Sequence, residues 1–106
     1  MTTFDKREEA FEKKFALDEE LRFKAEARRN SLLGLWVASL LGRSGDAAAA
    51  YAKEVVVADL DHPDGGALRK VTGDLDAAGV AIPEAELGAK IDELTARAIL
   101  QVKAGE

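Results

Sequence analysis

The segment from Asp18 to Gly42 constrains the fold most, because it changes midway from a charged sequence to an apolar one. No glycine or proline interrupts it between Leu17 and Leu33, and this continuity predicts one long helix. Its second half contains Trp36, the only tryptophan, within a broad apolar face that predicts burial in a core. Gly42 stands where a left-handed residue commonly ends a helix. We therefore expect this segment to join a charged N-terminal arm to a helical body.

The composition predicts one all-α domain spanning residues 1–106. Ala, Leu, Glu, Lys and Arg dominate, and these residues have the highest helix propensities. Aromatic residues amount to only 6%, which disfavours a strand-rich core. The chain contains no cysteine, so disulfides and thiolate metal ligands are excluded.

Three further helices are expected after Gly42. The first starts near Ser44 to Asp46 and runs to about Leu60, the second spans about 67–78, and Pro83 fits the first position of the last. The positions expected to face inward are Tyr51, Val55 and Leu60, then Leu68, Val71, Leu75 and Ala78, and finally Leu87, Ile91, Leu94, Ala98 and Val102.

Short connections between these helices predict an antiparallel four-helix bundle over residues 20–106. The preceding arm, residues 1–19, is expected to be helical or partly disordered, because its charge density leaves little apolar surface to bury. Within the long helix, Gly34 is expected to allow close approach of a neighbouring helix.

The arm carries an apolar stripe among its charges. A first helix is expected over 5–17, with Thr3 as its N-cap. Phe4, Phe11 and Phe15 would share one face of that helix. Two interpretations remain open at this point: the stripe packs back on the body as core, or it anchors a partner protein.

The charges divide unevenly along the chain. The first 30 residues carry eight basic and eight acidic side chains, so the whole net charge of −5 falls on the rest of the chain. An acidic body repels phosphate backbones, and nucleic-acid binding is therefore not expected. Charged pairs such as Glu20–Lys24 are expected to support the helix. A sharper interpretation is that four cations meet an acidic partner surface: Arg22, Lys24, Arg28 and Arg29.

The motifs of enzymes and cofactor sites are missing from the sequence. His62 is the only histidine and precedes a proline in a turn, where a surface role is usual. The glycine pair 65–66 before a helix could present N–H groups to a phosphate, yet neighbouring aspartates oppose this. We predict no catalytic residue, metal or cofactor. The N-terminus is not a signal peptide and no apolar run is long enough to span a bilayer, so a cytoplasmic protein without membrane insertion is expected.

Four stretches of the sequence resemble a known family. FEKKFA, DEELRFKAEARRN, LLGLW and LGRSGDAAAAYAKEVVVAD are similar to the zeta subunit of the alphaproteobacterial F-type ATP synthase. The match is specific over residues 1–61. From Asp64 onward it rests on helix pattern and length.

The resemblance implies a non-enzymatic inhibitor, peripheral to the inner membrane when bound to the synthase. In this family the arm inserts at a catalytic alpha/beta interface, reaches toward the gamma subunit and blocks rotation in the hydrolytic direction. By inference, the phenylalanines would bury in the interface cleft and the cations would pair with acidic groups. The partner-binding residues implied are Thr3, Phe4, Arg7, Phe11, Lys13, Lys14 and Phe15.

Two other functions compete with this interpretation. The first is a small nucleotide-sensing module, because some relatives bind ADP or ATP weakly. The second is a generic helical scaffold whose phenylalanine stripe docks in its own core. Since the arm contains no histidine, a histidine-based pH switch in the arm is not expected.

Overall fold

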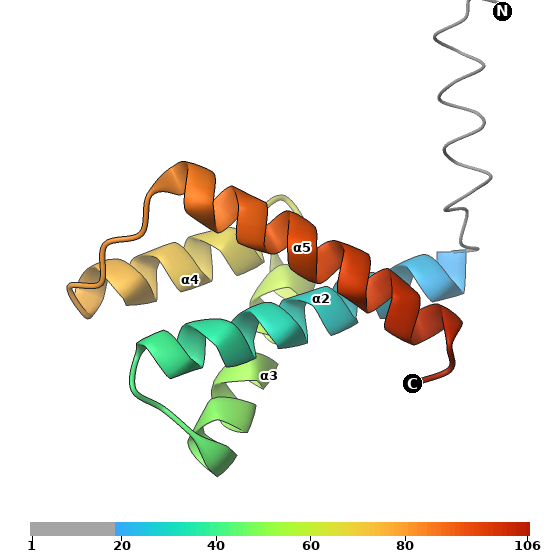
Figure 1. The fold of residues 1–106 in the computed structure, drawn as a ribbon, viewed down its shortest axis with the longest axis horizontal. Coiled ribbons are helices and arrows are strands. Elements are labelled where there is room, and N and C mark those ends of the chain that lie inside the picture. The colour runs from blue at the N-terminus through green and yellow to red at the C-terminus, as the bar shows by residue number, and fades with distance from the viewer. Residues whose placement is uncertain (1–18) are drawn as a thin grey trace, which may run out of the picture.

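The computed structural model describes residues 19–106, which form four helices and no strand (Figure 1). Successive helices reverse their direction, as the all-α four-helix prediction required, and that prediction is confirmed. The helix expected over 5–17 lies outside the described residues. The four helices are α2 (Glu19–Leu40), α3 (Gly45–Asp61), α4 (Gly66–Ala77) and α5 (Glu84–Lys103).

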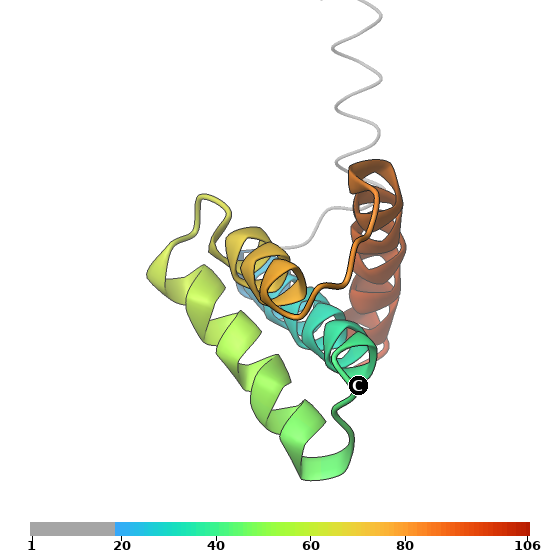
Figure 2. The same cartoon turned by 90° about the vertical axis from the view of Figure 1, so that its left-hand side faces the viewer.

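Helix α2 is the centre of the arrangement. It contacts each of the other three helices, and α3 in addition contacts α4. Seen along α2, helices α3 and α5 lie on opposite sides of it (Figure 2). The apolar second half of α2 therefore packs against neighbouring helices on more than one side, which accounts for its apolar sequence.

The core is built from small and branched side chains of all four helices. Trp36 packs against this core from its edge, with Lys90 Nζ 5.5 Å from the centre of the ring. The packing role expected for the tryptophan is thus confirmed. The buried cluster consists of Leu33, Val37, Ala38, Ala48, Tyr51, Val55, Ala67, Val71, Leu75 and Leu94.

Gly34 sets the distance between α2 and α3. A Cβ atom at this position would lie 2.6 Å from Ala52 Cα and 3.2 Å from Val55 Cγ2. Any side chain would therefore force the two helices apart. The close approach predicted for Gly34 is confirmed.

Helix ends follow the expected glycine signals, with one shift at the last helix. Gly42 has φ of 78°, and the N–H of Arg43 reaches back to the Ala38 carbonyl at 2.8 Å, which closes α2. Pro83 was expected as the first helical residue but precedes the helix. Its ψ of 140° is extended, while its carbonyl accepts the Leu87 N–H at 3.0 Å, so it occupies the N-cap position.

Three positions expected to face inward do not. Leu60 lies five residues after the buried Val55, about 140° around the helix, and is 53% exposed. Leu68 is exposed because α4 enters the core through Ala67 instead. Ala78 is exposed because α4 ends at Ala77. The inward face predicted for α5 is confirmed at Leu87, Leu94, Ala98 and Val102, and Ile91 packs beside it.

Candidate partner-binding surface

The predicted partner-binding residues precede the part of the chain that the structure describes. Thr3, Phe4, Arg7, Phe11, Lys13, Lys14 and Phe15 all lie before Glu19. Their roles stay predictions. What the structure describes is the helix onto which the arm runs directly, and the surfaces beside that junction.

The first turns of α2 are charged and ordered by their own side chains. Glu19 and Glu20 occupy the first turn, where negative charge is favourable to the helix dipole. Lys24 Nζ lies 3.1 Å from Glu20 Oε1, which confirms the expected pair. Because both side chains are largely exposed, this ion pair adds little to the free energy of folding.

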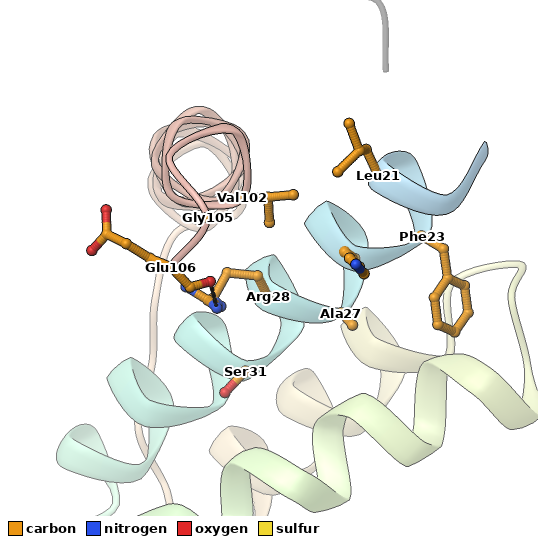
Figure 3. A pocket seen from close by; sticks show the side chains of 9 residues that line it. Leu21, Phe23, Ala27, Arg28, Ser31, Val102, Gly105 and Glu106 are labelled. Carbon is orange, nitrogen blue, oxygen red and sulfur yellow. Dashed lines mark hydrogen bonds between the residues drawn. The ribbon is translucent and has the colours of Figure 1, made fainter. Parts of the chain in front are cut away.

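Arg28 fastens α2 to α5. Its Nη1 atom donates to Gln101 Oε1 at 2.9 Å and its Nη2 atom donates to the Glu106 carbonyl, so the guanidinium connects the first half of α2 to the last turn of α5 and to the C-terminal residue. Arg28 and Glu106 border a pocket of about 420 Å³ that also includes Leu21 and Lys24 (Figure 3). Arg28 therefore has an internal role that its sequence position alone did not indicate.

A buried polar residue lies one position beyond the arginine pair. Asn30 is 2% exposed, and its Oδ1 atom accepts a hydrogen bond from Arg29 Nε at 3.1 Å. A buried amide needs such partners, since burial without them costs free energy. Arg29, like Arg28, is thus engaged within the molecule. Sequence reasoning missed Asn30 because an asparagine in a charged stretch gives no signal of burial.

An apolar groove runs between α2 and α3 on the side away from the core. It consists of two adjoining hollows of about 360 and 430 Å³, both of which include Val56. The large side chains that line it are exposed: Phe23 (56%), Leu35 (42%), Val57 (51%) and Leu60 (53%). We call this surface the α2–α3 groove. Sequence reasoning missed it because Leu60 was assigned to the core.

A polar cluster connects α3 to α4 on the side of α3 opposite the groove. The Tyr51 hydroxyl donates to Asp74 Oδ2 at 2.7 Å, and Lys70 Nζ lies 3.0 Å from the same oxygen. The cations of Arg43 and Lys70 lie 5.0 and 5.2 Å from the centre of the Tyr51 ring, within the range of cation–π attraction. The cluster joins both helices and the preceding loop.

The cluster shifts the pKa values of both of its acids. Burial, together with the hydrogen bond to Asp74 and its negative charge, raises the pKa of Tyr51. Burial also acts to raise the pKa of Asp74, but hydrogen bonds from Tyr51 and Lys70 and the positive charges nearby outweigh it. The pKa of Asp74 therefore lies below its usual 3.8.

The two glycines at the start of α4 have different roles: Gly65 is the N-cap with a left-handed φ of 99°, and Gly66 packs closely against α3. Gly66 is buried against the α3 backbone, and its N–H donates to the His62 carbonyl at 2.8 Å. This N–H is not available to a phosphate. Across residues 19–106, no group of three or more His, Asp or Glu side chains is placed to hold a metal ion. Within that same range, no helix is long and apolar enough to cross a membrane.

Comparisons with known proteins extend over most of the chain. Residues 1–101 match the family described as ATPase inhibitor subunit zeta. A protein whose structure was determined by NMR in solution is 52% identical to this chain. Its match covers 81% of this chain and 99% of the other, with a TM-score of 0.69. No curated protein matches.

Proposed function

The chain belongs to the ATPase inhibitor subunit zeta family, and on this premise we propose that it is a non-enzymatic subunit that blocks ATP hydrolysis by the F-type ATP synthase. The arm, residues 1–19, inserts at a catalytic alpha/beta interface and reaches toward the gamma subunit, so that rotation in the hydrolytic direction stops. The arm residues that carry the contact are Thr3, Phe4, Arg7, Phe11, Lys13, Lys14 and Phe15, the phenylalanines as apolar anchors and the cations as charge partners.

The position of α2 is the observation that supports this proposal best. In the sequence the arm ends at Glu19, the first residue of α2, and α2 is the helix that contacts all three others. A force on the arm is therefore transmitted to the whole body. A rotor can stall against an inserted peptide only when that peptide is attached to something that does not follow it.

The bridge made by Arg28 strengthens the attachment. Arg28 is the tenth residue of α2. Its hydrogen bonds to Gln101 and to the Glu106 carbonyl connect the first half of α2 to the C-terminal part of the chain. These bonds add to the apolar contacts that hold α2 within the body.

The direct test is ATP hydrolysis by the purified cognate catalytic head, measured with the full chain and with a chain lacking residues 1–17. We expect the full chain to lower the rate and the shortened chain to have no effect while keeping its helical circular dichroism. An unchanged rate at saturating full chain would disprove the function. Unfolding of the shortened chain would instead indicate that the phenylalanine stripe belongs to the core.

A point substitution refines this test. We expect Phe11→Ser to raise the concentration needed for half-maximal inhibition by about tenfold or more, as for an interface anchor. Leu100→Ser is the matched control, because Leu100 is a 69% exposed apolar residue. It lies on α5, whereas the arm is followed by α2. If both variants inhibit as strongly as the unmodified chain, Phe11 is not an anchor of the interface.

Nucleotide sensing is the second candidate function, and the pocket between α2 and α5 favours it. Its volume of about 420 Å³ and the cations Lys24 and Arg28 could suit a nucleoside diphosphate. Both cations already have internal partners, which weakens the case. Titration of the full chain with ADP, followed by amide chemical shifts, tests it. Saturable shifts at Arg28 and Val102 would support the pocket, and their absence would reject it.

A further inference from the structure

We propose that the α2–α3 groove is a second docking surface, and that it receives an apolar helical ridge of the same catalytic head that receives the arm. The inference rests on the proposed function. It adds a proposed contact site on the helical body, residues 20–106, for the same partner. Of the seven large apolar side chains that are exposed among residues 19–106, four border this groove.

Clustering is what distinguishes the groove from ordinary exposed apolar residues. Single exposed leucines such as Leu68 on α4 and Leu100 on α5 are common on protein surfaces. Large apolar side chains that gather along one furrow, rather than lie singly, are typical of interaction sites. In the groove, Phe23 and Leu60 line one hollow and Leu35 and Val57 line the next.

The shape of the groove suits a helix. On α2 its lining residues recur every four positions, from Phe23 through Ala27 and Ser31 to Leu35, which places them along one stripe. On α3 the lining runs in the opposite direction, from Leu60 to Ala49. Two neighbouring helices with an apolar furrow between them accept the apolar face of a third.

Charges at the two ends would orient the occupant. Glu26 and Asp59 border the hollow that contains Phe23, while Lys53 borders the hollow that contains Leu35. A complementary ridge carries a cation at the Phe23 end and an anion at the Leu35 end. Apolar contact supplies most of the affinity, and the charges fix the direction.

The position of Phe23 places the groove close in the chain to the arm. Phe23 lies four residues after Glu19, about 6 Å along the helix axis from the point where the arm ends. Figure 3 shows its ring turned away from α5 toward α3, so the groove opens at the same end of α2 as the arm. A partner that holds the arm is therefore held within reach of the groove.

The test uses the full chain with the double substitution Phe23→Ser and Leu60→Ser, and measures inhibition of the cognate catalytic head. We expect the half-inhibitory concentration to rise by about tenfold or more, because two anchors are lost. The maximal inhibition should persist, since the arm is intact. The double substitution Leu68→Ser and Leu100→Ser is the matched control and should leave the half-inhibitory concentration within about twofold.

A second readout separates the two proposals. A photoreactive side chain at position 60 should cross-link to subunits of the head, whereas the same group at position 100 should not. If the unmodified chain fails to inhibit but position 60 cross-links, the docking surface stands and the inhibitory function falls. If the chain inhibits and the groove substitutions change neither readout, the docking surface is wrong.

Two other occupants would also overturn the inference. A dimer in analytical ultracentrifugation that the groove substitutions convert to a monomer would identify a second copy of this chain. Amide shifts at Val56 and Leu60 on removal of residues 1–18 would identify the arm itself. We expect the chain to sediment as a monomer and those amides to stay unchanged.

Discussion

Helices α2 and α3 meet along one line, with a core on one side of it and the groove on the other. On the core side, Leu33 is 2% exposed because α4 and α5 close over it. On the groove side, Leu35 is 42% exposed because none of the described helices covers it. The two leucines are two positions apart in one helix. Their difference shows that apolar sequence does not by itself distinguish a core from an interface.

The three consecutive valines of α3, residues 55–57, show the same difference in exposure between the core side and the groove side. Val55 is fully buried in the core, Val56 is half-buried where the two sides meet, and Val57 is 51% exposed beside the groove. Each residue advances by 100° around the helix, so three identical side chains reach three environments. The side facing the core is expected to govern stability, and the side facing the groove to govern binding.

The largest expected contrast compares Leu33→Ala with Leu35→Ala. Leu33→Ala removes buried methyl groups and leaves a cavity, so it should lower the free energy of unfolding by about 2–5 kcal/mol. Leu35→Ala removes an exposed side chain and should change it by no more than about 0.5 kcal/mol. Urea unfolding followed by circular dichroism measures both. Equal losses would show that the groove is covered in the free protein.

A smaller contrast concerns the contact line itself. Gly34→Ala should lower the free energy of unfolding by up to about 2 kcal/mol. Overpacking against Ala52 costs about 1–3 kcal/mol, and the gain in helix propensity returns about 1 kcal/mol of this. Gly73→Ala is the matched control, since a Cβ there meets no atom within 4 Å. It should raise the free energy of unfolding by about 0.5–1 kcal/mol. Stabilisation by both substitutions would mean that α2 and α3 separate at little cost.

The smallest change in the free energy of unfolding is expected at the polar cluster of Tyr51, Lys70 and Asp74. The folded-state pKa of Asp74 is lowered, so its contribution to stability is present above the unfolded-state pKa, near 4. That contribution is lost as the pH falls through the folded-state value. Asp74→Asn should cost about 1 kcal/mol at pH 7, and this cost should shrink progressively as the pH falls below about 4. The exposed Asp76→Asn serves as control in thermal unfolding at both pH values. A loss from Asp74→Asn that does not depend on pH would contradict this account.

Much of the fold follows from the sequence because helix signals are local. The continuity before Leu33 predicted the long α2, and Gly42 predicted a helix end at which the chain indeed turns left-handed. Pro83 was misplaced by one residue, since a proline fits both the N-cap and the first position sterically. The resemblance to the zeta family is confirmed, and the match extends to residue 101.

Surfaces were harder to predict than helices. Leu60 was expected in the core because apolar residues at helical spacing can face either side, and the sequence does not state where the neighbouring helix ends. Arg28 was expected to face solvent or a partner, yet it reaches Gln101, 73 positions away. The arm residues stay predictions. The proposed inhibition rests on these arm residues, which were inferred from the sequence. The proposed second docking surface rests on the groove, which was found in the structure.

The sequence by itself determined the helices, their ends, the close approach at Gly34 and the family. These depend on interactions within a few residues, or on the absence of a side chain, and both can be read along the chain. Only the tertiary structure decided which apolar side chains are buried. Burial depends on whether another helix covers a given face, and that is a property of all the helices together.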